Sequence, residues 1–168
     1  TCGVETKIVT AVDVSGWAAN DSPYFVPLLE RTAKYFTMQE VSADKAYLSH
    51  ANLKAVAKHN AIPYIPFKIN TAVPTENSLW AEMYYYFMHN REEFLAHYHK
   101  RSNVETAFSM IKAKFGDAVR SKSDIGQLNE VLCKVLCHNL CVIIQAIHES
   151  GIDPTFCAER LLAQKSVE

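Results

Sequence analysis

Four features that would place a chain in a special class are missing from this sequence. No uninterrupted apolar run approaches the roughly 20 residues that cross a bilayer, so we expect no membrane partner. The start, Thr1-Cys2-Gly3, shows no signal-peptide pattern and opens directly into a strand-like stretch, as a chain cut from something longer would. No internal repeat or low-complexity linker divides the 168 residues, which are therefore expected to form one domain with a real core.

The five cysteines lack the even number and the spacing of a disulfide framework, and free thiols fit a reducing, cytoplasmic compartment. Cys133, Cys137 and Cys141 recur every fourth residue, which places them on one face of a helix beside His138. A metal site on that face is one interpretation, but zinc ligands usually come from a turn and a second element. We therefore expect these cysteines to be small core residues.

The formal net charge of -1 does not indicate a nucleic-acid-binding protein, but the charge is unevenly distributed. Six basic residues between positions 100 and 122 face two acidic ones, and six minus two leaves a local excess of four. They are Lys100, Arg101, Lys112, Lys114, Arg120 and Lys122, against Glu105 and Asp117. This segment is either a surface for nucleic acid or a solvated basic helix face.

Strand-like and helix-like patterns alternate along the first half of the chain and indicate an α/β fold with at least partly parallel pairing. The predicted strands cover residues 7–14, 38–43 and 61–67, the last with two prolines that favour an edge position or an early end. The predicted helices cover 24–36, after helix-start residues at 20–23, and 49–60.

The second half is predicted to be helical. Residues 78–115 predict two helices that meet near His97 and stop at Phe115-Gly116-Asp117. A longer helix is expected from about Ser123 to Ser150, ended by Gly151. Because this helix is apolar on most faces, we expect it to be buried or packed against a partner.

Asp44 follows the second predicted strand at its carboxyl end, where functional groups of α/β sheets collect. An aspartate that caps a helix or forms a turn is just as common at such a position. Both interpretations of Asp44 therefore stay open.

A polar stripe runs along the helix predicted to begin near Tyr98. Tyr98, Arg101, Glu105 and Lys112 fall within an arc of about 60°, at roughly 100° per residue. Apolar residues lie on the other side, where they can pack onto a sheet: Val104, Ala107, Phe108, Ile111 and Phe115. The stripe is either a functional surface or a solvent face with ion pairs at i, i+4 spacing.

The spacing Tyr98-x2-Arg101-x3-Glu105-x6-Lys112 matches the YREK signature of a large group of DDE transposases from bacterial insertion sequences. Further segments also resemble that family, and the similarity runs from about residue 4 to residue 150. They are ADKAYLS (43–49), YIPFKIN (64–70), HYHKRSNVETAFSMIKAKFG (97–116) and NEVLCKVLCHNLCVII (129–144). The resemblance implies an RNase H-like fold, a mixed sheet flanked by helices, and metal-dependent cleavage and joining of DNA strands at transposon ends.

Carried over by motif, Asp44 is the second catalytic aspartate and Glu105 the catalytic glutamate of this family. Both would bind a pair of Mg²⁺ ions, for which Mn²⁺ can substitute. Tyr98, Arg101 and Lys112 would contact DNA near the cut. The implied partners are double-stranded DNA, at transposon ends and target, and further copies of the chain on that DNA. The implied location is the cytoplasm, at the nucleoid.

The resemblance has a gap at the start of the chain. The chain opens at a segment similar to the family's third strand, so the first two strands and the first catalytic aspartate are expected to be missing. Asp13 and Asp21 are not expected to replace that aspartate, and residues 1–168 would be the C-terminal portion of one catalytic domain. Two alternatives stay open: a catalytically incomplete remnant that only binds DNA or a partner, and another RNase H-like nuclease, against which the YREK spacing speaks.

Overall fold

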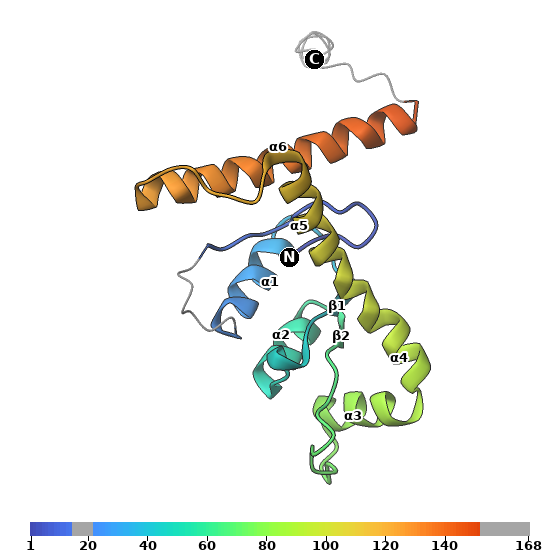
Figure 1. Cartoon of the computed structure of the whole chain (residues 1–168). Helices are drawn as coiled ribbons and strands as arrows, with labels where there is room; N and C mark the ends of the chain where they lie inside the picture. The colour runs from blue at the N-terminus through green and yellow to red at the C-terminus, as the bar shows by residue number, and fades with distance from the viewer. Residues whose placement is uncertain (15–21, 152–168) are drawn as a thin grey trace, which may run out of the picture.

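The computed structural model describes residues 1–14 and 22–151, an α/β structure in which helices predominate (Figure 1). The helices are η1 (Ser22–Tyr24), α1 (Phe25–Ala33), η2 (Lys45–Tyr47), α2 (His50–Lys58), α3 (Leu79–His89), α4 (Arg91–Tyr98), η3 (His99–Arg101), α5 (Ser102–Phe115) and α6 (Asp124–Glu149), where η marks a 3₁₀ helix. The strands are β1 (Glu40–Ser42) and β2 (Ile62–Tyr64).

The two strands pair in parallel, with Val41 opposite Pro63. Both strand predictions in this region are confirmed, although each strand is shorter than expected. Pro63 lacks an amide hydrogen, and among the described residues β2 has β1 as its one neighbour, so the proline costs the sheet little. The backbone of Ala43 still donates to the carbonyl of Tyr64 (3.4 Å), which carries the pairing to the residue just before Asp44.

The predicted strand at residues 7–14 is wrong. The chain folds back on its own start, with one isolated antiparallel bridge between Cys2 and Val9 and a left-handed turn at Lys7 (φ 60°). The amide and carbonyl of Val9 bond to the side-chain amide of Asn139 on α6, at 2.8 and 2.9 Å. A side chain thus takes the hydrogen bonds that a neighbouring strand would have taken.

Most predicted helices are present, with shifted ends. The helix expected over 24–36 is α1, and its predicted start residues Asn20 and Asp21 lie outside the described residues. The second helix, α2, begins where expected because the hydroxyl of Ser49 accepts from the amide of Asn52 (3.1 Å).

The helical region 78–115 has one more break than predicted. α3 ends at His89, inside a stretch expected to continue to near His97, and α4 then meets η3 and α5 just after His97. The predicted stop is confirmed: α5 ends at Phe115, and Gly116 follows with φ 81°, a conformation that favours glycine.

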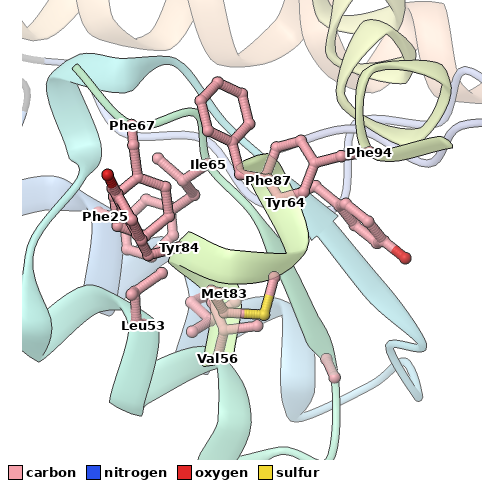
Figure 2. Close-up of a cluster of buried hydrophobic side chains, with 12 residues drawn as sticks. Phe25, Leu53, Val56, Tyr64, Ile65, Phe67, Met83, Tyr84, Phe87 and Phe94 are labelled. Carbon is pink, nitrogen blue, oxygen red and sulfur yellow. The ribbon is translucent and has the colours of Figure 1, made fainter. Parts of the chain in front are cut away.

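A single hydrophobic cluster joins α1, α2, β2, α3 and α4 (Figure 2). Its centre is aromatic: the ring of Phe94, fully buried on α4, meets Tyr64 of β2 edge-on at 5.3 Å and Phe87 of α3 at 5.0 Å. Edge-to-face packing of this kind fixes ring orientation as well as burying apolar area. The cluster therefore holds α4 against β2, and with it the chain that leaves α4 toward α5.

α6 is present as predicted, but it is not buried within the described residues, and the alternative expectation, that a partner packs on it, stays a prediction. Its N-cap is Ser123, whose hydroxyl accepts from the amide of Gly126. The helix crosses one end of the molecule, and both of its ends reach past the neighbouring helices (Figure 1). Only Val135 and His138 on α6 are buried, and the ring of His138 donates to the carbonyl of Lys7 (3.0 Å). Its exposed apolar residues are Ile125, Leu128, Leu132, Leu136, Leu140, Ile143 and Ile144.

One further expectation for α6, the core position of its cysteines, is corrected. Cys133 and Cys137 are exposed and Cys141 is half-buried, so they are not core residues, while Cys157 lies outside the described residues. In length and composition α6 is also the one helix of the described chain that could cross a membrane, although a single helix of this kind is weak evidence for a span. Its apolar residues form no uninterrupted run, because polar residues such as Glu130, Lys134 and His138 divide them.

Candidate functional site

Asp44 stands at the carboxyl end of β1, immediately before η2. Its backbone carbonyl accepts from the amide of Tyr47 (2.9 Å), but its carboxylate makes no capping hydrogen bond. The side chain is half-exposed and is directed instead to Tyr98, at the end of α4, and to Arg101 of η3. The capping alternative therefore explains where Asp44 lies in the backbone and leaves the role of its carboxylate open.

Tyr98 and Arg101 bring the short helix η3 to this carboxylate. The hydroxyl of Tyr98 donates to Oδ1 of Asp44 (3.2 Å), and Nη1 of Arg101 donates to Oδ2 (3.4 Å). Nε of Arg101 lies 3.3 Å from Oδ1 and donates to the Tyr98 hydroxyl oxygen (2.9 Å). The three side chains thus form a closed hydrogen-bonded group between the end of β1 and the start of α5.

Glu105 joins the same group one helical turn later. Nη1 of Arg101 donates to Oε1 of Glu105 (3.0 Å), so one guanidinium holds both Asp44 and Glu105. The structure thus brings together two carboxylates that are distant in sequence. The Arg101–Glu105 contact is also the i, i+4 ion pair that the alternative interpretation of the stripe predicted.

Arg101 remains charged at any ordinary pH. The hydrogen bond to Tyr98 is the main cause that raises the pKa of Arg101 above its usual value; burial opposes this, and Asp44 and Glu105 add to it. The carboxylates are open to solvent, with 50% of the Asp44 and 66% of the Glu105 side chain exposed, against 32% for Arg101. Two exposed negative groups around one fixed positive charge leave the group with a net negative charge.

A second polar cluster fastens the α4–η3 junction to the other end of β1. Glu40 accepts from Nζ of Lys100 (2.7 Å) and bonds Nδ1 of His97. The His97 ring stacks on Tyr64 at 4.4 Å, and its carbonyl accepts from the hydroxyl of Ser42 (2.9 Å). Burial tends to raise the pKa of Glu40, but the hydrogen bonds from Lys100 and His97 outweigh it and hold that pKa below its usual value.

This Glu40 cluster is not predictable from the sequence alone. The i, i+3 spacing of His97 and Lys100 was its only local sign, and Glu40 lies too far along the chain to be linked to them without a structure. The cluster matters for the site because η3 is now held at both ends of β1. Glu40 is the first residue of β1, and Asp44 lies just beyond its last residue.

Two other predicted residues stand apart from this group. Lys112 is exposed two turns further along α5, and its side chain makes no hydrogen bond or ion pair among the described residues. Asp13 pairs with Arg31 at 3.1 Å and makes no contact with this group in the described residues. Asp21 lies outside the described residues.

On the apolar side of α5, Ala107 and Ile111 are buried as expected, whereas Phe108 is exposed.

Asp44 and Glu105 fit part of a metal-binding set. Hard divalent cations take carboxylate oxygens, and both carboxylates already converge on one positive group, the Arg101 guanidinium. A complete set is not formed, because within residues 1–14 and 22–151 no three His, Cys, Asp or Glu side chains are grouped to hold a metal ion. For the same reason, Cys133, Cys137, His138 and Cys141 on α6 are not grouped as metal ligands in the described chain.

A protein-family model described as a transposase DDE domain matches residues 1–140. The match contains β1, η3 and α5, and so every residue of the Asp44–Tyr98–Arg101–Glu105 group. No curated protein and no solved structure matches the chain.

Proposed function

The chain belongs to the transposase DDE domain family, and from this we propose that it carries two of the catalytic carboxylates of a DNA transposase, Asp44 and Glu105. The family acts on DNA and generally uses divalent metal ions. One observation carries the residue assignment: carboxylates from the end of β1 and from α5 converge on a single positive group.

In this proposal Asp44 and Glu105 are two of the ligands of the metal, Mg²⁺ or Mn²⁺ in its place. When bound, the metal would stabilise charge on the reacting phosphate and activate the attacking water or 3′-hydroxyl. The chain's own contribution is to hold the two carboxylates at one point: Asp44 on the strand end, Glu105 on the first turn of α5, and η3 seated between them by the Glu40 cluster. Their exposure leaves that point open to a DNA strand.

Tyr98, Arg101 and Lys112 are the proposed DNA contacts. Arg101 presents a planar guanidinium beside the carboxylates, and Lys112 extends the same face of α5. Both can neutralise phosphates, while the Tyr98 ring can stack on an exposed base. The local excess of positive charge between residues 100 and 122 supports a DNA strand lying along α5.

The finer assignments belong to the same proposal. We place the chain in the YREK-signature group, with an RNase H-like sheet of which the parallel β1–β2 pair is a part, and we treat residues 1–168 as a portion of one catalytic domain. The substrates proposed are transposon ends and target DNA, handled at the nucleoid by several copies of the chain.

A second candidate is a catalytically incomplete transposase that only binds DNA or a partner. The absence of a third ligand near Asp44 and Glu105 in the described residues favours it. The two candidates differ in one property: only the enzyme loses strand cleavage when a carboxylate is removed.

Glu105→Gln separates them. In the intact protein this change should lower cleavage of transposon-end DNA at least about 100-fold, the upper range seen when a group one shell further from a metal is lost. Binding of the end should stay nearly unchanged when a gel shift measures it without divalent metal. Glu92→Gln is the matched control, because it removes an exposed carboxylate from neighbouring α4. Cleavage by Glu105→Gln at the rate of that control would refute the catalytic assignment.

A further inference from the structure

Arg101 bridges the two carboxylates that are the proposed metal ligands. Its Nη1 donates to both Glu105 (3.0 Å) and Asp44 (3.4 Å), and its Nε donates to the Tyr98 hydroxyl (2.9 Å). Among the described residues Nη2 donates to no group, and about a third of the side chain is exposed. The guanidinium therefore faces the carboxylates with one edge and solvent with another.

A divalent cation and this guanidinium compete for the same oxygen lone pairs. The carboxylates bring two negative charges and Arg101 brings one positive charge, so a cation of charge two would meet a site already half neutralised. Its ligand oxygens, Oδ of Asp44 and Oε of Glu105, are the atoms that now accept from Nη1. Because the positive guanidinium lies between the two carboxylates, a cation shared by both of them favours release of Arg101 from at least one.

A DNA phosphate offers Arg101 an equivalent partner. The guanidinium binds phosphate with the same two-pronged geometry that it uses for carboxylate. Ion pairs this exposed contribute little to stability, so their exchange for a phosphate costs little. The backbone need not move, because Glu40 holds η3 through Lys100 and His97, neither of which belongs to the exchanging group.

We propose that Arg101 is an exchangeable occupant of the Asp44–Glu105 pair: DNA phosphate draws its guanidinium away, and the released carboxylates then take the metal. DNA and divalent metal would thus bind cooperatively through one side chain. This inference rests on the proposed function. It adds an order of binding, because the metal site opens once a DNA strand is in place. By linkage the effect is reciprocal, so metal must raise DNA affinity by the same factor.

The test measures Mn²⁺ affinity of the full chain from the electron paramagnetic resonance signal of free Mn²⁺, with and without a saturating short DNA duplex. For the unaltered chain the affinity should rise with DNA by a factor of about 5 to 150, the usual span of coupling between two sites. In Arg101→Ala, Mn²⁺ should bind more tightly without DNA, and the rise on adding DNA should be lost. Lys112→Ala is the control: it should weaken DNA binding yet keep the rise once DNA is saturating.

Two results would overturn the inference. One is an Mn²⁺ affinity of the unaltered chain that DNA does not change, and the other is a rise that persists in Arg101→Ala, which would mean that the DNA itself supplies the added ligands. If Arg101→Ala does not fold, DNA affinity of the unaltered chain with and without Mn²⁺ gives the same factor without any variant. A chain that binds Mn²⁺ and DNA independently fails this inference alone, whereas one that binds neither also fails the proposed function.

Discussion

Replacing Glu40 by Gln tests whether the Glu40 cluster positions the site. The change keeps the size of the side chain and removes its charge, so the contacts with Lys100 and His97 lose their ionic component. Because these contacts hold η3 on β1, the loss should reach Tyr98 and Arg101, which lie on the same short segment as His97 and Lys100.

The expected size follows from burial. The Glu40 side chain is 23% exposed and its partners 38% and 31%, so the cluster lies between surface pairs and buried ones. Exposed pairs contribute up to about 1 kcal/mol each, so we expect the free energy of unfolding to fall by about 1–2 kcal/mol. For a chain of this size that lowers Tm by about 2–8 °C.

The assay is thermal unfolding followed by circular dichroism at neutral pH, with a gel shift on duplex DNA in parallel. Glu92→Gln is again the matched control, and should change stability by less than about 0.5 kcal/mol. We expect Glu40→Gln to lower both Tm and DNA affinity. An unaltered Tm would show that the cluster does not stabilise the junction, and a lowered Tm with full DNA affinity would show that it does not position the site.

The same variant should alter how stability depends on pH. The pKa of Glu40 is lower in the folded chain than in the unfolded one, so the folded state favours the charged form. The stability that this gives is present above the unfolded pKa and is lost as pH falls through the folded pKa. Glu40→Gln should therefore differ most from the unaltered chain near neutral pH, and the two should converge in acid. A constant difference in urea unfolding down to the acid range would contradict this.

Two further predictions concern the core and the DNA-binding face. Phe94→Ala should lower the free energy of unfolding by about 3–5 kcal/mol, because a fully buried ring that meets Tyr64 and Phe87 is lost; urea unfolding measures this, and a loss below about 1 kcal/mol would mean that the ring is not central to the core. Arg101→Ala should weaken DNA binding and reduce the slope of log affinity against log salt by about 1, as expected for one lost phosphate contact, and an unchanged slope would argue against that contact.

The positions of Asp44, Tyr98, Arg101 and Glu105 were largely predictable, because the end of a strand and the helical periodicity determine them. A residue just after a strand must lie at the sheet's edge, which placed Asp44, and helical spacing put Tyr98, Arg101 and Glu105 on one face. That the two features meet was implied by the resemblance alone. The role of Arg101 as a bridge between the carboxylates was not predicted, since it depends on how far β1 lies from η3 in space.

The wrong predictions concern segments whose structure depends on contacts with residues distant in the sequence. Residues 7–14 have strand-forming composition, but Asn139 of α6 satisfies the backbone of Val9 and no strand forms. The apolar composition of α6 predicts burial without naming what covers it, and most of its apolar residues, with Cys133 and Cys137, are exposed in the described chain. Local sequence determined which elements form, and long-range contacts determined what each one packs against.

Anomalous X-ray scattering from crystals of the chain soaked with Mn²⁺ and a short DNA duplex tests the central claim most directly. We predict an Mn²⁺ ion bound by carboxylate oxygens of both Asp44 and Glu105, with the Arg101 guanidinium turned to a phosphate. Mn²⁺ bound only elsewhere, with Arg101 still bridging the two carboxylates in the presence of DNA, would contradict the account.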